Sequence, residues 1–301
     1  MKKLANRLLL LGLLLAPALA LAQPSLQLSL PQKSADPSLW HVKGPAGEAY
    51  LFGSVHVLPP GLAWQTPAIR RALARSDVYV FEVPQDEKAV AELSGLMQQK
   101  GFLPPGQSLR GLLHREARSD YDAAVAASGL PPAAIDRDRP WLAGLQLMFG
   151  QMTKLHFDRD TGVEAVLSDR AAREHKQMRY LETISEQFAL LAPDNDMLEL
   201  EEFESGLKDL RDITAELDPM IKAWSAGDQA SLDKLINGDL DQFPEARKEL
   251  LDDRNARWVP KIEAMLKEKH VFFITVGAGH LTGPKGVPAL LRKDGYRVDG
   301  P

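Results

Sequence analysis

The chain of 301 residues contains no cysteine. This absence excludes disulfides, zinc–thiolate sites, Fe–S clusters and thiol catalysis. A chain of this length has enough core to fold without disulfides, and a chain without cysteine cannot mispair in an oxidising compartment. The cysteine count is therefore compatible with export.

The chain also lacks an excess of basic residues, with 36 Lys and Arg against 41 Asp and Glu and a formal charge of −5. A nucleic-acid-binding protein would show a basic stripe, so we expect no nucleic-acid partner. With 45% apolar and 26% charged residues, the composition is that of an ordinary globular protein. It excludes collagen-like, wholly disordered and multi-span membrane chains.

Residues 1–22 have the features of a cleaved signal peptide. A basic start precedes an uncharged run from Leu8 to Ala22, and Ala20-Leu21-Ala22 fits a small-x-small cleavage site before Gln23. The alternative is a membrane-spanning helix, but the run is short for a bilayer and Pro17 interrupts it. We therefore expect a periplasmic or secreted protein with no stable membrane span after cleavage and, without a cysteine at the cleavage site, no lipid anchor.

The rest of the sequence predicts a flexible lead-in at 23–37 and a single domain at 38–301. Apolar runs and turn residues predict strands, and helical spacing predicts helices between them. The expected strands are 39–43, 48–52, 78–83, 179–183, 271–276 and 295–299, and the expected helices are 66–76, 286–293 and two long helical insertions at about 86–176 and 185–268. Strands separated by helices indicate a mixed α/β or α+β fold around a central sheet.

Two segments far apart in the sequence end in the same motif. Gly53-Ser54-Val55-His56 and Gly277-Ala278-Gly279-His280 each follow an apolar strand and read Gly-x-x-His. Glycine at a strand exit allows a sharp turn or a close approach, and ligand sites in open α/β sheets lie at the carboxyl ends of strands. A lone Gly-x-x-His is weak, but two such matches suggest a shared site.

Glu82 closes the strand at 78–83, so it could reach the same rim as His56 and His280. Two imidazoles and a carboxylate suit a divalent metal, which would activate water for hydrolysis. A metal-free alternative uses one histidine as general base and Arg254 to stabilise an oxyanion. Glu82 could instead cap a helix or pair with a nearby arginine, and Glu182, which closes another short strand, is a candidate of the same kind.

These residues resemble the TraB/GumN family, the group that includes the Tiki proteins. The segments YLFGSVHVLP and VFFITVGAGHLTGPKGVPALLRKDGYRV carry the specific part of the resemblance, and VYVFEV, RYLETISEQFALL and LLDDRNARWVPKIEAML match further blocks. The resemblance covers residues 38–299. It implies a sheet built from two related halves that each end in Gly-x-x-His, similar to erythromycin-esterase and ChaN-like folds.

The resemblance also implies roles for individual residues. His56 and His280 match the motif histidines, Glu82 the family glutamate, Glu182 the acid of the L-E-T block, and Arg254 with Asn255 the Arg-Asn pair; Gly53, Gly277 and Gly279 are structural residues of the motifs. Glu164 stands where we expect the family to carry Asp. The longer side chain of Glu would shift the position of the carboxylate, and with it any group that this carboxylate positions.

Tiki proteins are described as metal-dependent proteases. We therefore expect an exported metal-dependent hydrolase of peptide or amide bonds that uses Mn, Co or Zn and acts on an unknown peptide or small-molecule substrate. His56, Glu82 and His280 would hold the metal, and Glu82, Arg254 and Glu182 would be catalytic. The alternatives are a periplasmic metal or haem carrier without turnover, and a metal-free esterase-like hydrolase.

Overall fold

The computed structural model describes residues 33–301 except 158–160, 193–195, 212 and 239. The expected signal peptide at 1–22 lies outside the described residues, as do residues 23–32 of the expected lead-in. Within the described part, the helices are too short or too polar to cross a bilayer.

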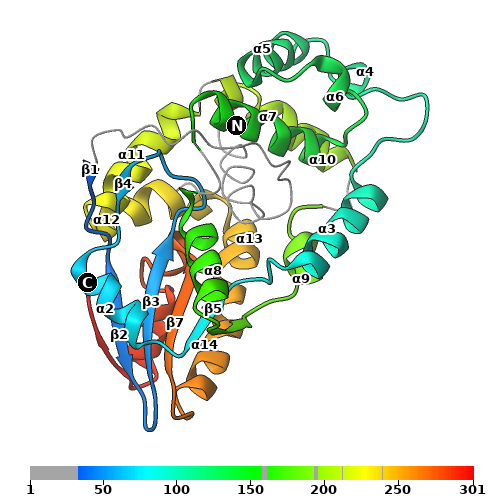
Figure 1. The fold of residues 1–301 in the computed structure, drawn as a ribbon. Coiled ribbons are helices and arrows are strands. Elements are labelled where there is room, and N and C mark those ends of the chain that lie inside the picture. Colours follow the sequence, from blue (N-terminus) through cyan, green and yellow to red (C-terminus); the bar gives the residue numbers. More distant parts are fainter. Residues whose placement is uncertain (1–32, 158–160, 193–195, 212, 239) are drawn as a thin grey trace. The chain divides into compact units, whose positions relative to one another are not determined.

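From residue 62 onward, strands are separated by single helices or by long runs of helices, and the longest runs lie within residues 87–173 and 184–265 (Figure 1). The strands are β1 (Lys33–Ser34), β2 (Leu39–Lys43), β3 (Glu48–Ser54), β4 (Leu62–Ala63), β5 (Val78–Phe81), β6 (Gln177–Tyr180), β7 (Val271–Gly277) and β8 (Arg297–Asp299). The helices are α2 (Pro67–Arg75), α3 (Glu87–Lys100), α4 (Leu109–Leu112), α5 (Arg118–Ser128), α6 (Pro132–Ile135), α7 (Pro140–Lys154), α8 (Val163–Arg173), α9 (Ile184–Ala189), α10 (Asp196–Gly206), α11 (Thr214–Ser225), α12 (Gln229–Leu232), α13 (Pro244–Arg247), α14 (Asp253–Met265) and α15 (Val287–Lys293). Short 3-10 segments cover Asp209–Arg211, Leu240–Gln242 and Ala278–His280, and π-helical turns cover Asp233–Asn237 and Lys248–Asp252.

The chain divides into two compact units. A sheet unit contains the described parts of Leu21–Pro84, Arg159–Thr183 and Asp218–Pro301, and a helical unit contains those of Gln85–Asp158 and Ile184–Leu217. The fold is therefore mixed α/β, as the alternation of strands and helices predicts.

The sheet unit is built on six strands in the order β6-β5-β7-β3-β2-β8. The four strands β6, β5, β7 and β3 run parallel, and β2 pairs antiparallel with both β3 and β8. The strands that carry the two Gly-x-x-His motifs, β3 and β7, are neighbours, with Ser54 opposite Gly277. This parallel register brings both motifs to the same edge of the sheet.

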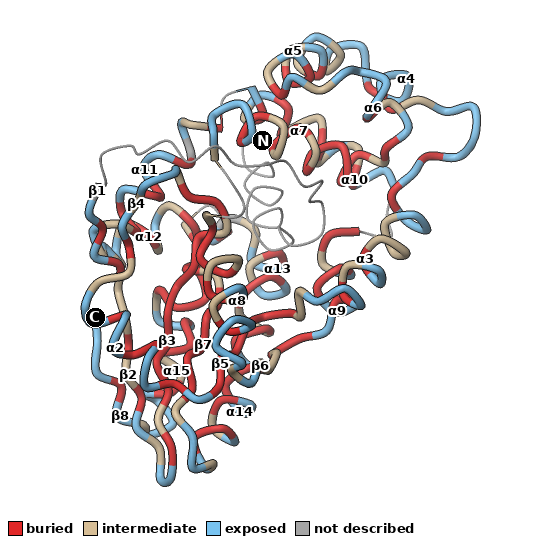
Figure 2. Tube along the Cα trace, viewed as in Figure 1, coloured by how far each residue is buried: buried red, intermediate tan, exposed pale blue. Residues whose placement is uncertain are grey.

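One face of the sheet packs against α14 and α15. Alternate strand residues such as Leu51, Val80 and Ile274 meet Trp258 and Leu291 in one apolar cluster. The strands β3, β5 and β7 are mostly buried (Figure 2). Strands buried on both faces are expected to be continuously apolar, which is why these three are recognisable in the sequence.

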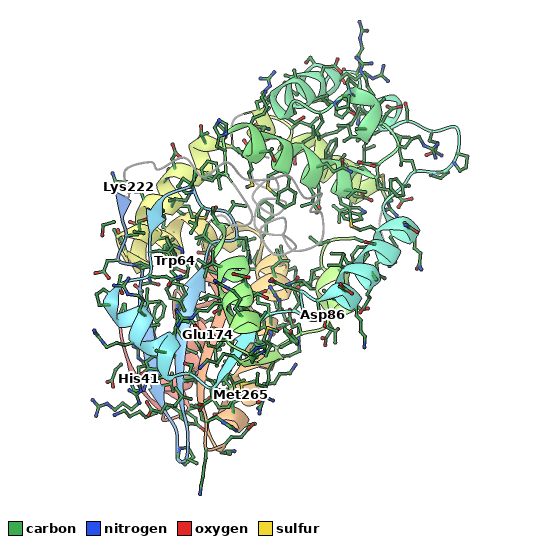
Figure 3. The ribbon with its side chains drawn as sticks, viewed as in Figure 1. His41, Trp64, Asp86, Glu174, Lys222 and Met265 are labelled. Atoms are coloured by element: carbon green, nitrogen blue, oxygen red, sulfur yellow. The ribbon has the colours of Figure 1, made fainter. Side chains whose placement is uncertain are left out.

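The other face carries aromatic side chains. Phe273 on β7 lies near Phe52 on β3, with ring centroids 5.9 Å apart, and near Tyr79 on β5, at 6.0 Å. Trp64, labelled in Figure 3, stacks on Phe52 at 5.5 Å. The indole N–H of Trp224 on α11 donates to the Gly53 carbonyl at 2.8 Å, which ties α11 to the exit of β3.

Most of the predicted elements are confirmed, with small shifts at their ends. The hairpin of β2 and β3 and the helix α2, capped by Thr66, agree with the sequence pattern. Strand β6 begins at Gln177 and ends at Tyr180 instead of covering 179–183. Of the expected lead-in, Lys33–Ser34 pairs with Leu62–Ala63.

The helical unit has its own packing. Helix α7 packs against α5 and α10, and α3 packs against α9. Trp141 on α7 meets Phe188 on α9 edge to face at 5.5 Å, and Tyr121 on α5 meets Phe203 on α10 at 6.3 Å.

Candidate active site

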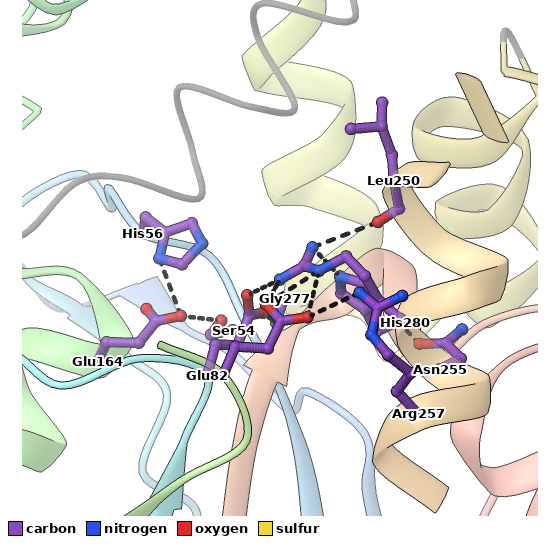
Figure 4. A network of polar contacts seen from close by, with 11 residues as sticks. Ser54, His56, Glu82, Glu164, Leu250, Asn255, Arg257, Gly277 and His280 are labelled. Atoms are coloured by element: carbon purple, nitrogen blue, oxygen red, sulfur yellow. Dashed lines mark hydrogen bonds and ion pairs between the residues drawn. The ribbon is translucent and has the colours of Figure 1, made fainter. Parts of the chain in front are cut away.

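Each of the four parallel strands ends just before a predicted site residue. His56 follows β3, Glu82 follows β5, Glu182 follows β6, and His280 follows β7. Carboxyl ends of parallel strands meet at one edge of a sheet, where ligand sites of open α/β sheets form. Two hydrogen-bonded groups occupy this rim (Figure 4).

The first group, the Arg254 cluster, consists of Arg254, Asn255, Glu82, Glu182 and His280. Arg254 lies at the start of α14 and is fully buried. Its Nη2 donates to Glu82 at 2.7 Å and to Glu182 at 2.8 Å, and its Nε donates to Glu182 at 2.9 Å. Its Nη1 donates to Nε2 of His280 at 2.9 Å and to the Leu250 carbonyl at 3.3 Å. Every N–H of the guanidinium therefore has an acceptor.

The charge of Arg254 is held by its two carboxylate partners. Burial acts to lower the pKa of Arg254, but Glu82 and Glu182 outweigh it, so the pKa is raised above its usual value. A buried charge of this kind is stable only when it is paired and hydrogen-bonded. The guanidinium also lies over the ring of Trp258, 4.7 Å from its centroid. Arg254 is therefore a permanent cation of the rim.

His280 is neutral in this arrangement. Its Nε2 accepts from Arg254, and its Nδ1 lies 2.7 Å from Oδ1 of Asn255. Because the amide oxygen can only accept, Nδ1 carries the proton. The pKa of His280 lies well below its usual range. The largest cause is burial of the ring, followed by the charge of Arg254 and then by His56.

Asn255 and Glu82 connect the cluster to the surrounding backbone. Nδ2 of Asn255 donates to the Lys285 carbonyl at 3.0 Å. Oε1 of Glu82 accepts from the Gly277 N–H at 2.7 Å. The first bond links α14 to the segment before α15, and the second links the end of β5 to the end of β7, so the cluster is anchored from several elements.

The second group, the His56 pair, consists of His56 and Glu164. Nδ1 of His56 lies 2.9 Å from Oε1 of Glu164, which stands in the first turn of α8. Ser54 donates its hydroxyl to the same oxygen of Glu164. Glu164 thus orients the imidazole of His56, the last residue of the first motif. Glu164 is also the position where the family is expected to carry Asp, so that position contacts a motif histidine directly.

Two of the three predicted motif glycines allow close approach. A Cβ on Gly53 would lie 3.1 Å from Cα of Ala278, and a Cβ on Gly279 would lie 2.8 Å from Ile236. Gly277 acts through its backbone, because its N–H donates to Glu82. The exits of β3 and β7 therefore pack closely, as glycine at a strand end suggests.

Sequence reasoning missed residues that support the rim from π-helical turns. Asn237, in the turn Asp233–Asn237, donates to the Gly279 carbonyl at 3.2 Å and to the Thr282 hydroxyl at 2.9 Å. The turn Lys248–Asp252 supplies the Leu250 carbonyl to Arg254. Such turns are frequent at functional sites, but no simple residue pattern marks them in a sequence.

The predicted metal ligands do not form one group. Glu82 and His280 bond the same guanidinium, whereas His56 bonds Glu164. Within the described ranges, no set of three or more His, Cys, Asp or Glu side chains is arranged to hold a metal ion. In this arrangement the residues do not fit a metal, and a set of ligands at His56, Glu82 and His280 stays a prediction.

Comparison with known proteins agrees with the motifs. Residues 38–300 match the model of the TraB/PrgY/gumN family. The chain belongs to this family. The match covers nearly all of the described residues, including both histidine motifs and the Arg254 cluster.

The family member Metalloprotease TIKI2 of Danio rerio is 27% identical over 331 residues, which cover 89% of this chain and 61% of the relative. Metalloprotease TIKI1 of Homo sapiens is 24% identical, with 89% of this chain and 62% of the relative covered. The protein YbaP of Escherichia coli is 23% identical, with 81% and 87% covered. The chain thus spans less than two thirds of the length of these Tiki relatives.

Proposed function

We propose that this TraB/PrgY/gumN family member is a hydrolase of peptide or amide bonds that acts at the rim formed by β3, β5, β6 and β7. The single observation that carries the proposal is the His56 pair beside the Arg254 cluster. The similarity to proteins named metalloproteases supports a peptide or amide substrate.

In the proposed reaction His56 is the general base. Glu164 binds Nδ1, so Nε2 is the ring nitrogen that would take a proton from water. The activated water attacks the scissile carbonyl carbon, and the protonated imidazole returns the proton to the leaving amine. A carboxylate behind an imidazole both orients the ring and stabilises its charged form.

Arg254 does not act on the substrate in this scheme. All of its N–H groups are donated within the rim, and its side chain is fully buried. Arg257, one turn further along α14, keeps 51% of its side chain exposed and lies 3.6 Å from Glu182. It is the cation that we assign to the developing oxyanion.

The metal expected from the sequence, Mn, Co or Zn, has no step in this scheme. A metal held by His56, Glu82 and His280 would have to displace the hydrogen bonds that Glu82 and His280 make with Arg254. The name of the Tiki relatives favours a metal, and the contacts of Arg254 oppose one at these residues. A chelator arm in the activity assay separates the two forms of the hydrolase.

The test is a peptide-library digestion by the chain 23–301, read by mass spectrometry. We expect cleavage by the wild type, and a loss of about a hundredfold or more in His56→Ala. The matched control is His41→Ala, because His41 also pairs with a carboxylate, Glu48 at 2.6 Å, but lies inside β2. Equal cleavage by wild type and His56→Ala would contradict the proposal.

We also propose that the chain is exported. The support is the basic, apolar and small-residue pattern of residues 1–22 together with the absence of cysteine. Expression of the full chain in a bacterium, followed by fractionation and N-terminal sequencing, should give a periplasmic product that begins at Gln23. A full-length product in the cytoplasm would contradict export.

A further inference from the structure

The atoms that a metal would use at this rim all face one guanidinium. Glu82 and Glu182 each present a carboxylate oxygen to Arg254, at 2.7 and 2.8 Å, and His280 presents Nε2 at 2.9 Å. Two carboxylates and a neutral imidazole are residue types found in divalent metal sites, but here the carboxylates face Nη2 and the imidazole faces Nη1 of one guanidinium centre. Here the centre is the side chain of the protein's own arginine.

We propose that the Arg254 guanidinium is the built-in cation of this site, and that it occupies the position in which a divalent metal would bind Glu82, Glu182 and His280. Wild-type protein therefore takes up no metal through these residues. Removal of the Arg254 side chain converts the same residues into a metal site.

The charge of the cluster supports this substitution. Arg254 places one positive charge against the two carboxylates, and its side chain is fully buried, as are those of Glu82 and Glu182 to within a few per cent. Without Arg254, the two buried carboxylates would lose their buried counter-charge, an unfavourable arrangement that the half-exposed Arg257, 3.6 Å from Glu182, would compensate only in part. A divalent cation would restore the compensation.

The imidazole is already oriented for the role. Metal-binding histidines commonly donate the other ring N–H to a fixed acceptor, which orients the ring. In His280 that acceptor is Oδ1 of Asn255, itself held by the Lys285 carbonyl. Replacement of the guanidinium would leave Nε2 directed at the vacated space.

The readout is metal content and thermal stability rather than turnover, so the inference does not depend on the proposed hydrolase. Chain 23–301 is soaked with Zn²⁺ or Mn²⁺, desalted and analysed by elemental mass spectrometry, as wild type, His280→Ala, Arg254→Ala and Arg254→Ala/His280→Ala. Melting temperatures are recorded with metal and with chelator.

We expect equal metal content in wild type and His280→Ala, and an added equivalent in Arg254→Ala that the double variant loses. Metal should raise the melting temperature of Arg254→Ala and leave that of the wild type unchanged, since a ligand stabilises the state it binds. If Arg254→Ala folds with metal but not with chelator, that outcome also shows stabilisation by bound metal. Arg179→Ala is the control, because it removes an arginine from a part-exposed pair with Glu268.

Two results would overturn the inference. The first is an equivalent of metal in the wild type that His280→Ala loses, because a metal would then already use the cluster. The second is folded Arg254→Ala that takes up no metal. Where Arg254→Ala folds in neither condition, the wild-type and His280→Ala arms still test whether a metal uses the cluster.

Discussion

Oδ1 of Asn255 lies 2.7 Å from Nδ1 of His280 and thereby determines which ring nitrogen of this buried histidine carries the proton. The bond spans 25 residues and joins α14 to the exit of β7. It keeps Nε2 as the acceptor of the Arg254 hydrogen bond. The orientation of the His280 ring within the Arg254 cluster therefore depends on one amide.

Asn255→Ala should lower peptide hydrolysis by up to about tenfold, because Glu182 contacts both Arg254 and Arg257, so disturbing Arg254 also disturbs the cation assigned to the oxyanion. The loss arises because the ring of His280 can then rotate and release Arg254. Steady-state kinetics on a cleaved peptide measure the effect. Asn255→Asp retains the acceptor oxygen and should recover part of the rate; equal rates in all three proteins would contradict the role of the amide.

Glu164→Ala should reduce hydrolysis more strongly than Ser54→Ala. Glu164 holds Nδ1 of His56 at 2.9 Å, whereas Ser54 only donates to the same carboxylate. Removal of the carboxylate releases the imidazole that acts as base, so we expect a loss of about a hundredfold. Ser54→Ala should cost less than about tenfold, since it removes one hydrogen bond to the Glu164 carboxylate and leaves that carboxylate in place on His56. The ratio of the two kcat/KM values is the measurement, and similar losses would argue against His56 as the base.

The positions of the site residues were predictable from the sequence, but their contacts were not. Apolar runs identify β3, β5 and β7 because both faces of these strands are buried, and residues that follow such strands must lie near one edge of a parallel sheet. The sequence pattern predicts β6 two residues too late, because the side chains of this strand are exposed or half-buried and give a weak apolar pattern.

The contacts themselves join residues that no local pattern relates. Arg254 bonds Glu82 across 172 residues, and Ser54 bonds Glu164 across 110. Spacing along the chain indicates that an acid is near a rim, but not whether it faces a metal, a histidine or a buried arginine. This is why Glu82 and His280 could be predicted as metal ligands and yet bond a guanidinium.

Gly279→Ala should destabilise the sheet unit by about 1–3 kcal/mol, because added atoms in a filled space force their neighbours to move. Its Cβ would lie 2.8 Å from Ile236 and 3.1 Å from Oδ1 of Asn237. Gly95→Ala is the matched control. Gly95 lies inside α3 with no atom within 4 Å of an added Cβ, so alanine there should raise the free energy of unfolding by up to about 1 kcal/mol. Urea unfolding of both variants gives the values, and equal changes would show that the second motif tolerates a side chain at Gly279.

Asp138 should make the helical unit less stable as the pH rises. It precedes α7, is 1% exposed, and accepts one hydrogen bond from Gln146 at 2.7 Å. Burial raises the pKa of Asp138 from 3.8 to about 7. The unfolded chain releases this proton near its ordinary pKa, while the folded chain keeps it until near neutrality, so the unfolded state binds fewer protons over that interval. The contribution to stability is therefore fully present below the unfolded pKa and is lost as the pH rises through the folded one.

Asp138→Asn tests this sign, because it replaces the protonated acid with a neutral group of the same shape. The free energy of unfolding of the wild type, relative to the variant, should fall by on the order of 2 kcal/mol between pH 5 and pH 8. Urea titrations of both proteins at several pH values measure the difference. A difference that stays constant with pH would mean that Asp138 is ionised in the folded protein and that its burial is compensated by a partner other than Gln146.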